Sequence, residues 1–490
     1  MRTALLSDWL AQRIDKADIA PLYRQLQDAL RQAILLHELA PGRKLPSSRL
    51  LATELGIGRN TVIQVYEQLA LEGYVQAGTG SGTFVADSAP DTRFAGVTLP
   101  QPTASTQPLS ARGRRLLDAA GVSRRQWGAF VPGVADVTRF PSEVWSRLQS
   151  RRMRNLQPEL LSYAPPGGHM PLREVLAEYL RSARGVRCHA EQVIITTGIH
   201  QSVDLAVRLL SDSGDEVWTE DPCYWGVRSV MQASGLQLRS IAVDAEGINP
   251  SEADLARPPR MMLVTPSHQY PLGMVMSLAR RRMLLEYARQ TQSWIIEDDY
   301  DSEFRFASRP LGALQGMDEA DRVIYVGSLG KILYPGLRVG YMVVPPALAE
   351  PFALALAELF REGQSLQQAV LADFIEQGHF GAHIRRMRHV YGQRRELLMQ
   401  AIATHFGADW PVHGDEAGLH LVLGLPDQVD DQLVAQAALA AGIATRPLSA
   451  YYSGGASRQK GLLLGYACVP DAEIASAFAV LAAVVKALGV

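Results

Sequence analysis

The sequence predicts an α/β protein in which a small helical domain precedes a much larger domain built on a sheet. Its 490 residues exceed the length of one ordinary domain, so two or three domains are expected. Three short helical patterns and a glycine-linked hairpin occupy the N-terminal part of the chain. From about Gln126 onward, short apolar runs alternate with helical patterns, which is typical of a mainly parallel sheet covered by helices. Hydrophobic residues make up 47% and charged residues 20%, a balance that indicates a globular protein.

The N-terminal patterns predict a winged helix-turn-helix over residues 18–86. Apolar side chains recur at helical spacing in the first segment. Ser47 or Ser48 can cap the second helix, and Gly56 ends it. Three helices followed by a hairpin are the elements of a winged helix-turn-helix. The helices are expected over 21–39, 47–55 and 58–72, and the strands over 74–77 and 83–85.

A local basic patch accompanies these elements. The net charge of −2 provides no overall attraction to nucleic acid, so a DNA contact must come from a local surface. Arg43, Lys44, Arg49 and Arg59 form such a cluster. Arg59 also begins a helix, where the backbone amides and the helix dipole favour a phosphate group.

Three motifs in this region resemble the DNA-binding domain of GntR-type repressors. They are Leu45-Pro46-Ser47-Ser48-Arg49, Leu55-Gly56-Ile57-Gly58-Arg59-Asn60-Thr61-Val62 and Leu71-Glu72-Gly73-Tyr74. The resemblance implies that the third helix enters the major groove of DNA and that the wing approaches the minor groove. It assigns DNA contacts to Ser48, Arg49, Arg59, Asn60 and Thr61, with Thr79 and Gly80 at the wing tip. The alternative is a winged helix that contacts proteins, with solvated arginines.

Residues 87–121 are predicted to be a flexible linker. The segment is rich in Pro, Ser, Thr and Ala and shows no apolar period, so it cannot bury enough surface to fold alone. Its length exceeds that of an ordinary loop. Three arginines near its end, Arg112, Arg114 and Arg115, are interpreted as solvated.

Residues 126–490 form the large domain, in which five buried strands are expected. Open α/β sheets gather their functional residues at the carboxyl edge of the strands. Gly198-Ile199-His200 connects the first strand to a helix beginning at about Gln201. The strands are expected over 193–197, 216–222, 261–266, 294–297 and 323–326.

The stretch from Ile295 to Tyr341 carries a set of reactive groups at the ends of two of these strands. A carboxylate, a phenol, a hydroxyl, a lysine and an arginine follow one another here. This set suits a cofactor with a phosphate, a basic ring nitrogen and an aldehyde, namely pyridoxal 5′-phosphate. Lys331 is the candidate for the Schiff base, because an imine requires a primary amine. The alternative for Lys331 is an exposed cation after a strand.

Asp298 is the candidate partner of the ring nitrogen. A buried carboxylate beside a protonated ring nitrogen keeps the ring electron-poor. Glu297 and Asp299 are competing choices, and strand alternation places them on the opposite face. Tyr300 shares the face of Asp298 and would donate to the phenolic oxygen of the cofactor.

The large domain resembles the fold-type I aminotransferases, specifically those fused to a GntR-like domain in the MocR regulators. The motifs are Phe140-Pro141-Ser142-Glu143-Val144-Trp145, Tyr163-Ala164-Pro165-Pro166-Gly167-Gly168, Thr265-Pro266-Ser267-His268-Gln269-Tyr270-Pro271-Leu272-Gly273 and Glu297-Asp298-Asp299-Tyr300-Asp301-Ser302-Glu303-Phe304. The resemblance implies a smaller C-terminal α+β subdomain as well.

The remaining cofactor contacts are assigned by residue type within this frame. Arg338 offers a bidentate fork to the phosphate, and Ser328 offers a hydroxyl. The backbone amides of Gly198, Ile199 and His200 lie at a helix start. Tyr224 would stack on the ring, or else be an ordinary core aromatic residue. The resemblance further implies that Tyr163 reaches the phosphate of a neighbouring subunit, and therefore that the protein is a homodimer.

Two positions depart from the family pattern, and one is uncertain in role. Gly330 stands where a serine is common, so one phosphate contact could be missing. Tyr270 stands where aminotransferases place an asparagine, as MocR members tend to show. Arg446 is the best candidate to bind an effector carboxylate, and a surface salt bridge is its alternative role.

The remaining sequence features narrow the class of protein. Three scattered cysteines, Cys188, Cys223 and Cys468, provide neither metal-ligand spacing nor a disulfide framework, so no metal is expected and a reducing cytoplasm fits. No signal peptide is expected, because charges are mixed into the apolar residues of segment 1–20, and no membrane span is expected, because Glu473 and Lys486 interrupt the most apolar segment, 472–490.

These features predict a transcription regulator that senses pyridoxal 5′-phosphate or an amine or amino-acid effector through Lys331. Two DNA-reading heads in a homodimer imply an operator with palindromic or repeated half-sites. An aminotransferase with an accessory DNA-binding domain is the alternative, because the residues for imine exchange are all present. A vestigial large domain without cofactor conflicts with the coherent set of Asp298, Ser328, Lys331 and Arg338.

Overall fold

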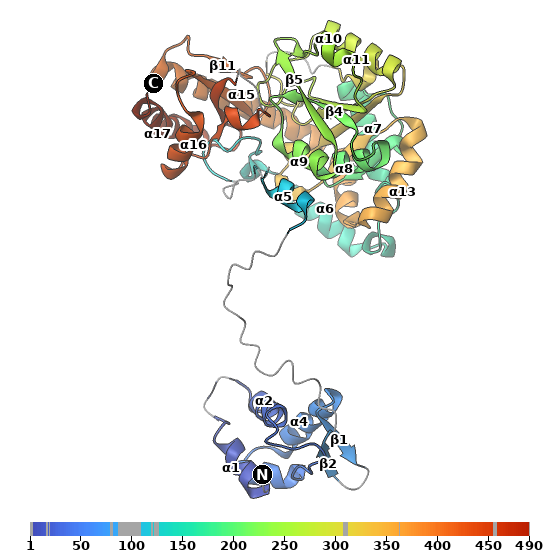
Figure 1. Ribbon diagram of the computed structural model, residues 1–490, viewed down its shortest axis with the longest axis vertical. Helices are drawn as coiled ribbons and strands as arrows, with labels where there is room; N and C mark the ends of the chain where they lie inside the picture. Colours follow the sequence, from blue (N-terminus) through green and yellow to red (C-terminus); the bar gives the residue numbers. More distant parts are fainter. Residues whose placement is uncertain are drawn as a thin grey trace. The chain divides into compact units, whose positions relative to one another are not determined.

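The chain divides into two compact units, Met1–Pro108 and Leu109–Val490 (Figure 1). The structure is a computed structural model, and it describes residues 3–15, 18, 20–78, 82–86, 109–118, 121, 127–306, 312–361, 363–453 and 458–489.

The first unit contains the predicted three helices and hairpin. Ser47 caps α3 by accepting a hydrogen bond from the Leu50 amide, and Gly56 ends α3 with a φ of 61°, so both helix signals are confirmed. An additional helix, α1, places Leu6 and Leu10 in the core of this unit. The wing residues Thr79 and Gly80 lie outside the described residues. The elements are α1 (Thr3–Ala11), α2 (Leu22–Leu35), α3 (Ser48–Leu55), α4 (Arg59–Leu71), β1 (Val75–Gly78) and β2 (Gly82–Val85).

The second unit is built on an eight-stranded sheet with the order β3-β10-β9-β8-β7-β4-β5-β6. Strands β9, β8, β7, β4 and β5 run parallel, and β10 pairs antiparallel with both β3 and β9. Strand β3 therefore shares the direction of β9, and the carboxyl ends of the predicted strands meet at one edge. The bounds are β3 (Val193–Thr196), β4 (Glu216–Asp221), β5 (Gln237–Asp244), β6 (Gly247–Ile248), β7 (Met261–Val264), β8 (Trp294–Asp299), β9 (Val323–Ser328) and β10 (Gly340–Val343).

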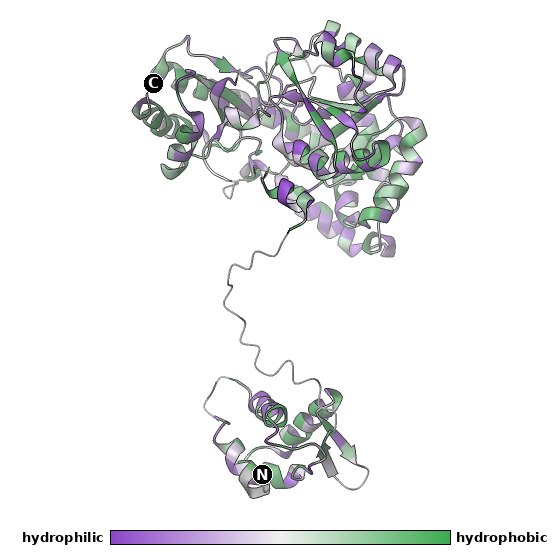
Figure 2. Cartoon of the chain, viewed as in Figure 1, coloured by the Kyte–Doolittle hydropathy of each residue, from purple (hydrophilic) through white to green (hydrophobic). Residues whose placement is uncertain are grey.

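Helices cover both faces of this sheet, because its strands are apolar on both sides. Each residue of β3, β7 and β10 is buried. Figure 2 shows that the outer helices carry hydrophilic as well as hydrophobic residues, as a helix between a core and solvent should. The helices around the sheet include α6 (Ser142–Arg154), α7 (Met170–Arg184), α8 (Ile199–Leu210), α9 (Trp225–Ala233), α10 (Glu252–Leu255), α11 (Leu278–Thr291), α12 (Leu329–Ile332), α13 (Ala349–Phe360) and α14 (Ser365–Glu376).

A smaller α+β subdomain follows the sheet, as expected. Its four-stranded antiparallel sheet has the order β11-β12-β14-β13. The bounds are β11 (Val412–His413), β12 (His420–Leu425), β13 (Arg446–Pro447), β14 (Lys460–Gly465), α15 (His379–Phe406), α16 (Asp431–Ala440) and α17 (Ile474–Ala487).

The segment predicted to be a linker contains a helix near its C-terminal end. Helix α5 (Ala111–Asp118) lies against α9 (Figure 1). The prediction of unstructured chain through residue 121 is therefore wrong for these eight residues. The sequence rule failed because a short polar helix gains its stability from tertiary contact rather than from an apolar period of its own. No helix in the described parts of the chain is long and apolar enough to cross a membrane.

Candidate cofactor site and DNA-binding surface

The N-terminal end of α4 forms an open basic surface on the first unit. Arg59 and Asn60 begin this helix and are exposed, Thr61 follows half-buried, and Arg49 is exposed on α3. Ser48, the first residue of α3, is half-buried. The structure thus places the predicted contact residues of α3 and α4 at the starts of the two helices.

The position of α4 relative to the rest of this unit is held by polar contacts. The Tyr66 hydroxyl donates a hydrogen bond of 2.9 Å to the Pro46 carbonyl, which joins α4 to the turn before α3. At the other end of α4, Arg31 of α2 forms an ion pair of 2.6 Å with Glu72. Because these contacts fix the helix at both ends, the side chains at its exposed start project from a rigid support.

A second site lies at the carboxyl edge of the large sheet. A cavity of about 140 Å³ opens between the ends of β3 and β9. Most of the residues predicted for the cofactor line it. They are Gly198, Ile199, His200, Tyr224, Ser328, Lys331 and Arg338, together with Thr197, Gly330, Pro335 and Val339.

One end of this cavity is suited to a phosphate. Helix α8 begins there at Ile199, and Gly198 precedes it with a φ of 126°, a conformation that favours glycine. A Cβ on Gly340 would lie 2.7 Å from the Cα of Gly198, so β10 and this turn approach too closely for larger residues. Amides at the start of α8, the Ser328 hydroxyl and the Arg338 guanidinium therefore face one volume.

Lys331 lies in the wall of the same cavity. Its ammonium nitrogen donates a hydrogen bond of 2.8 Å to the carbonyl of Gly133. Burial lowers the pKa of Lys331, and the carboxylates of Asp301 and Asp298 oppose that shift. A lysine amine with a lowered pKa is more often neutral and is therefore a better nucleophile toward an aldehyde.

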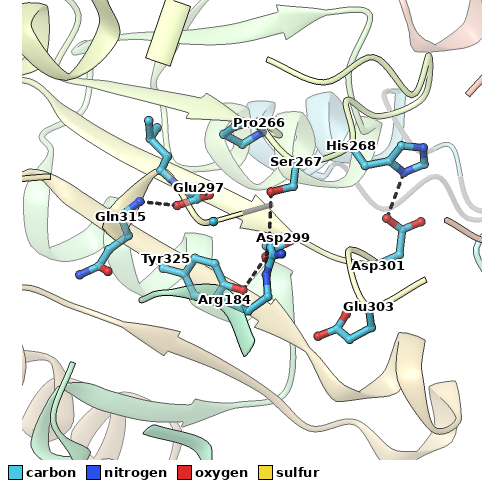
Figure 3. Close-up of polar contacts among 12 residues, drawn as sticks. Arg184, Pro266, Ser267, His268, Glu297, Asp299, Asp301, Glu303, Gln315 and Tyr325 are labelled. Carbon is cyan, nitrogen blue, oxygen red and sulfur yellow. Dashed lines mark hydrogen bonds and ion pairs between the residues drawn. The ribbon is translucent and has the colours of Figure 1, made fainter. Parts of the chain in front are cut away.

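The three consecutive carboxylates of β8 have different surroundings. Glu297 accepts hydrogen bonds of 2.8 Å from the amides of Leu314 and Gln315 (Figure 3). Asp299 forms a buried ion pair of 2.7 Å with Arg184 and accepts a hydrogen bond from the Tyr325 hydroxyl. These two carboxylates are thus engaged on the far side of the strand, as alternation predicts.

Asp298 lacks such partners. No residue in the described ranges forms a hydrogen bond with its carboxylate, although the residue is only 8% exposed. Burial, with a contribution from Asp299, raises the pKa of Asp298 to about 7, and Lys331 acts in the opposite direction. A buried carboxylate without a partner is costly, and a protonated ring nitrogen would satisfy it. The residues present therefore fit pyridoxal 5′-phosphate.

Aromatic residues form the remaining walls. The Tyr224 ring stacks on His200 at 5.7 Å between centroids and an interplanar angle of 5°. Burial raises the pKa of Tyr224 to about 12, so its hydroxyl stays protonated. Tyr270 packs edge-on against both Tyr224 and Tyr300, at 5.8 Å and 5.4 Å.

Four predicted residues are not among those that line the cavity: Asp298 and Tyr300 at the end of β8, and Tyr163 and Arg446. Tyr163 is 74% exposed and carries Arg361 over its ring at 5.7 Å. Arg446, in β13, is close enough to lower the pKa of Tyr224 and Tyr270, so it lies beside the aromatic wall. A single chain thus leaves Tyr163 at the surface.

The structure also brings in residues to which the sequence assigned no role in the site. His268 contacts Tyr300 and Asp301, and Gly133 accepts the hydrogen bond from Lys331. His268 and Asp301 lie in two of the motifs that resemble the aminotransferases. Their place in these motifs was the only sign in the sequence that they could belong to the site. Nothing in the sequence around Gly133 indicated a contact with a residue 198 positions away.

Comparisons with known proteins agree with this architecture. Residues 22–85 match the family described as bacterial regulatory proteins of the gntR family, and residues 135–481 match aminotransferase class I and II. The probable rhizopine catabolism regulatory protein MocR of Rhizobium meliloti is 39% identical over 93% of this chain and 92% of its own length. The pyridoxine biosynthesis transcriptional regulator PdxR of Corynebacterium glutamicum is 30% identical over 90% of this chain and 91% of its own.

Aminotransferases are among the solved structures similar to this chain. Kynurenine aminotransferase of Pyrococcus horikoshii in complex with PMP has a TM-score of 0.67 at 25% identity, over 79% of this chain and 97% of that one. The α-aminoadipate aminotransferase LysN of Thermus thermophilus, complexed with N-(5′-phosphopyridoxyl)-L-leucine, has a TM-score of 0.68 at 27% identity, over 77% and 95%. The chain belongs to the MocR-type regulators: a DNA-binding GntR winged helix joined to a pyridoxal 5′-phosphate-linked, fold-type I aminotransferase-like domain.

Proposed function

We propose that the aminotransferase-like domain serves as a sensor and that its occupancy changes how the protein binds DNA. The observation that carries the proposal is the cavity that joins Lys331, Ser328 and Arg338 to the start of α8 in a chain that also carries a GntR domain. Its ligand is pyridoxal 5′-phosphate itself, or an amine or amino acid that reacts with the lysine-bound cofactor. The names of PdxR and MocR concern pyridoxine biosynthesis and rhizopine catabolism, which fits ligands of these two kinds.

In this proposal each side chain has one task. Lys331 would hold the cofactor covalently, Asp298 would pair with its ring nitrogen and Tyr300 would donate to its phenolic oxygen. Tyr224 stacks on the ring. The phosphate is bound by Ser328, Arg338 and the amides of Gly198, Ile199 and His200, and Arg446 binds an effector carboxylate.

A homodimer is part of the same proposal. Tyr163 is exposed in the single chain although the family places this position at a phosphate, so a second subunit would give it a partner. Two winged helices per dimer would read a palindromic or repeated operator through Ser48, Arg49, Arg59, Asn60 and Thr61, with Thr79 and Gly80 at the wing tip. Since the partner is the chromosome, we place the protein in the cytoplasm.

The position of helix α5 suggests how ligand binding in the cavity could change the conformation of the linker. It is the first helix of the second unit, and it lies against α9, whose N-terminal cap is Tyr224 of the cavity wall. Gly121 follows α5, and a Cβ there would come within 2.7 Å of the Trp225 ring. A shift of Tyr224 on ligand binding would therefore act on the segment that leads to the DNA-binding unit.

The cofactor claim is tested by absorbance. The purified full-length protein incubated with pyridoxal 5′-phosphate should gain the visible band of a lysine imine, and borohydride reduction should fix the added mass. Lys331→Ala should lose both, whereas Lys486→Ala, which alters an exposed lysine on α17, should keep both. Absence of the visible band in the wild-type protein would contradict the assignment of pyridoxal 5′-phosphate as cofactor.

The sensor claim is tested by DNA binding. Affinity for operator DNA, measured with and without cofactor and with a panel of amines, should change on ligand addition, and Lys331→Ala should abolish the change. An equal affinity under all conditions would contradict it, because a ligand shifts an equilibrium only through differential binding.

Turnover is the second candidate function. The half-buried Lys331, with its lowered pKa, has the properties that imine exchange and proton transfer require. Formation of keto acid from an amino donor over many cycles would establish an enzyme. A single stoichiometric conversion would support the sensor.

A further inference from the structure

His268 lies between Asp301 and Tyr300 next to the cofactor site. Its Nδ1 is 3.0 Å from Oδ1 of Asp301 and 2.9 Å from the Tyr300 hydroxyl oxygen. Figure 3 shows the contact between His268 and Asp301. Their side chains are 2% and 1% exposed. Asp301 is close enough to Lys331 to raise its pKa, so the group borders the reactive lysine.

The two contacts of Nδ1 determine where the protons lie. A ring nitrogen of histidine holds either a proton or a lone pair. The other carboxylate oxygen of Asp301 accepts from the Leu419 amide at 3.3 Å, so Asp301 acts as an acceptor on both sides. A bare Nδ1 would direct its lone pair at a carboxylate oxygen 3.0 Å away in a buried site, which is repulsive. Nδ1 therefore carries a proton, which Asp301 accepts.

This arrangement leaves the proton of Tyr300 available. With a proton on Nδ1 there is no lone pair to accept from Tyr300, so the Tyr300 hydroxyl does not donate there; its oxygen shares the Nδ1 proton with Asp301 in a three-centre hydrogen bond. The hydroxyl has no second partner among the residues that the structure describes. Burial, followed by the charge of Asp301, raises the pKa of Tyr300, so the phenol keeps its proton.

We propose that Asp301 and His268 are positioning residues that orient Tyr300 as a hydrogen-bond donor toward the phenolic oxygen of the cofactor. The inference rests on the role proposed above for Tyr300. In the opposite tautomer, with the proton on Nε2, Tyr300 would donate to Nδ1 and its proton would be withheld from the cofactor. Asp301 thus selects the direction of the hydrogen bond through His268.

Packing holds the imidazole in this position. Gly418 has a φ of 83°, and a Cβ there would collide with the ring of His268 and with Asp301. Nε2 is buried without a hydrogen-bond partner in the described residues, so only Nδ1 orients the ring. The other titratable groups around the three residues include Glu220, Tyr270, Asp298, Lys331, His420 and Tyr466.

The first test needs no cofactor. Full-length protein labelled with ¹⁵N in histidine is examined by NMR without pyridoxal 5′-phosphate, and the His268 signals are assigned by their loss in His268→Gln. Nδ1 should be protonated, in a neutral or a cationic ring, and Asp301→Ala should move the proton toward Nε2. A bare Nδ1 in the wild type would overturn the proposal whether or not the protein binds a cofactor.

The second test follows the visible band of the cofactor-loaded protein against pH. A donor to the phenolic oxygen competes with the imine proton for that oxygen, so Tyr300→Phe should raise the midpoint by about one pH unit, the size of one charge-assisted hydrogen bond. His268→Phe should shift it in the same direction, and the double variant should shift it no further than Tyr300→Phe alone. Asp301→Asn should produce a smaller shift.

Controls separate this role from a general loss of packing. His389→Phe alters an exposed histidine on α15 and should keep the wild-type midpoint. An unshifted midpoint in His268→Phe, or shifts that add in full in the double variant, would refute the positioning role. If His268→Phe does not fold, the positioning role is decided by the midpoint of Asp301→Asn and by the protonation of Nδ1 in the wild-type NMR measurement. If no visible band forms, the proposed function fails and the NMR result still decides the tautomer.

Discussion

Asp298→Asn should have opposite effects on the free and the cofactor-loaded protein. The pKa of Asp298 rises from 3.8 to about 7, chiefly through burial, and this carboxylate gains no hydrogen bond from the described residues. A shift of about 3 pH units corresponds to roughly 4 kcal/mol against the ionised form. In the free protein, an asparagine should remove that cost. With cofactor bound, the same change would remove the proposed partner of the ring nitrogen.

The pH dependence follows from the direction of the shift. A carboxyl group with a raised pKa binds more protons in the folded than in the unfolded state, so its ionisation destabilises the fold. The destabilisation is absent below pH 3.8, grows as the pH rises toward about 7, and stays constant above that. The variant should therefore match the wild type in acid and exceed it above neutral pH.

Thermal unfolding of the free protein at about pH 5 and about pH 8 measures this difference. Asp298→Asn should melt several degrees higher than the wild type at the higher pH and gain less from added pyridoxal 5′-phosphate. Asp409→Asn, which alters an exposed carboxylate, should match the wild type in both respects. Equal melting temperatures for Asp298→Asn and wild type at the higher pH, or equal gains from cofactor, would refute the assignment.

Three further outcomes are expected. Arg59→Ala should weaken specific operator binding by about 1–3 kcal/mol if the side chain reads a base, and unchanged affinity in a titration would remove it from the interface. Arg184→Leu should lower the free energy of unfolding by about 3–5 kcal/mol, because it leaves Asp299 buried without its 2.7 Å ion pair; a near-neutral result in denaturant melts would contradict this. Gly121→Val should clash with the Trp225 ring and weaken the response of DNA binding to ligand, and a wild-type response in the same titration would remove α5 from the proposed route.

The sequence predicted those parts of the site that lie at strand ends. Ser328 ends β9 and Lys331 lies three residues further on, and Asp298 could be separated from its neighbours by the two-residue period of β8. The winged helix was predictable because glycines and caps mark its boundaries. Residue types and spacing within short segments were therefore enough to predict both the strand-end residues of the site and the winged helix.

Contacts between distant segments were beyond the reach of the sequence. His268 and Asp301 are 33 residues apart, and their contact depends on the glycine at position 418. The insertion of β10 between β3 and β9 gave no signal, since strand order is set by tertiary packing. Helix α1 was missed because only its burial of Leu6 and Leu10 shows which of its faces is apolar.

A reversible covalent site is well suited to sensing, provided that the two DNA-binding states hold the ligand differently. In the proposed function, attachment through Lys331 would supply affinity for any amine that can replace the lysine, and Arg446, which lies near Tyr224 and Tyr270, would supply selection among amines. Affinity and selection for the ligand affect DNA binding only if the free energy of ligand binding differs between the two DNA-binding states. The coupling between ligand binding and DNA binding acts equally in both directions. Operator DNA should therefore change the affinity of the large domain for its ligand by the same factor by which the ligand changes the affinity for DNA. Tyr224 lines the cavity and is also the N-terminal cap of α9, against which α5 lies. A substitution of Tyr224 is therefore the change that should first remove the mutual effect of ligand and DNA on each other's affinity.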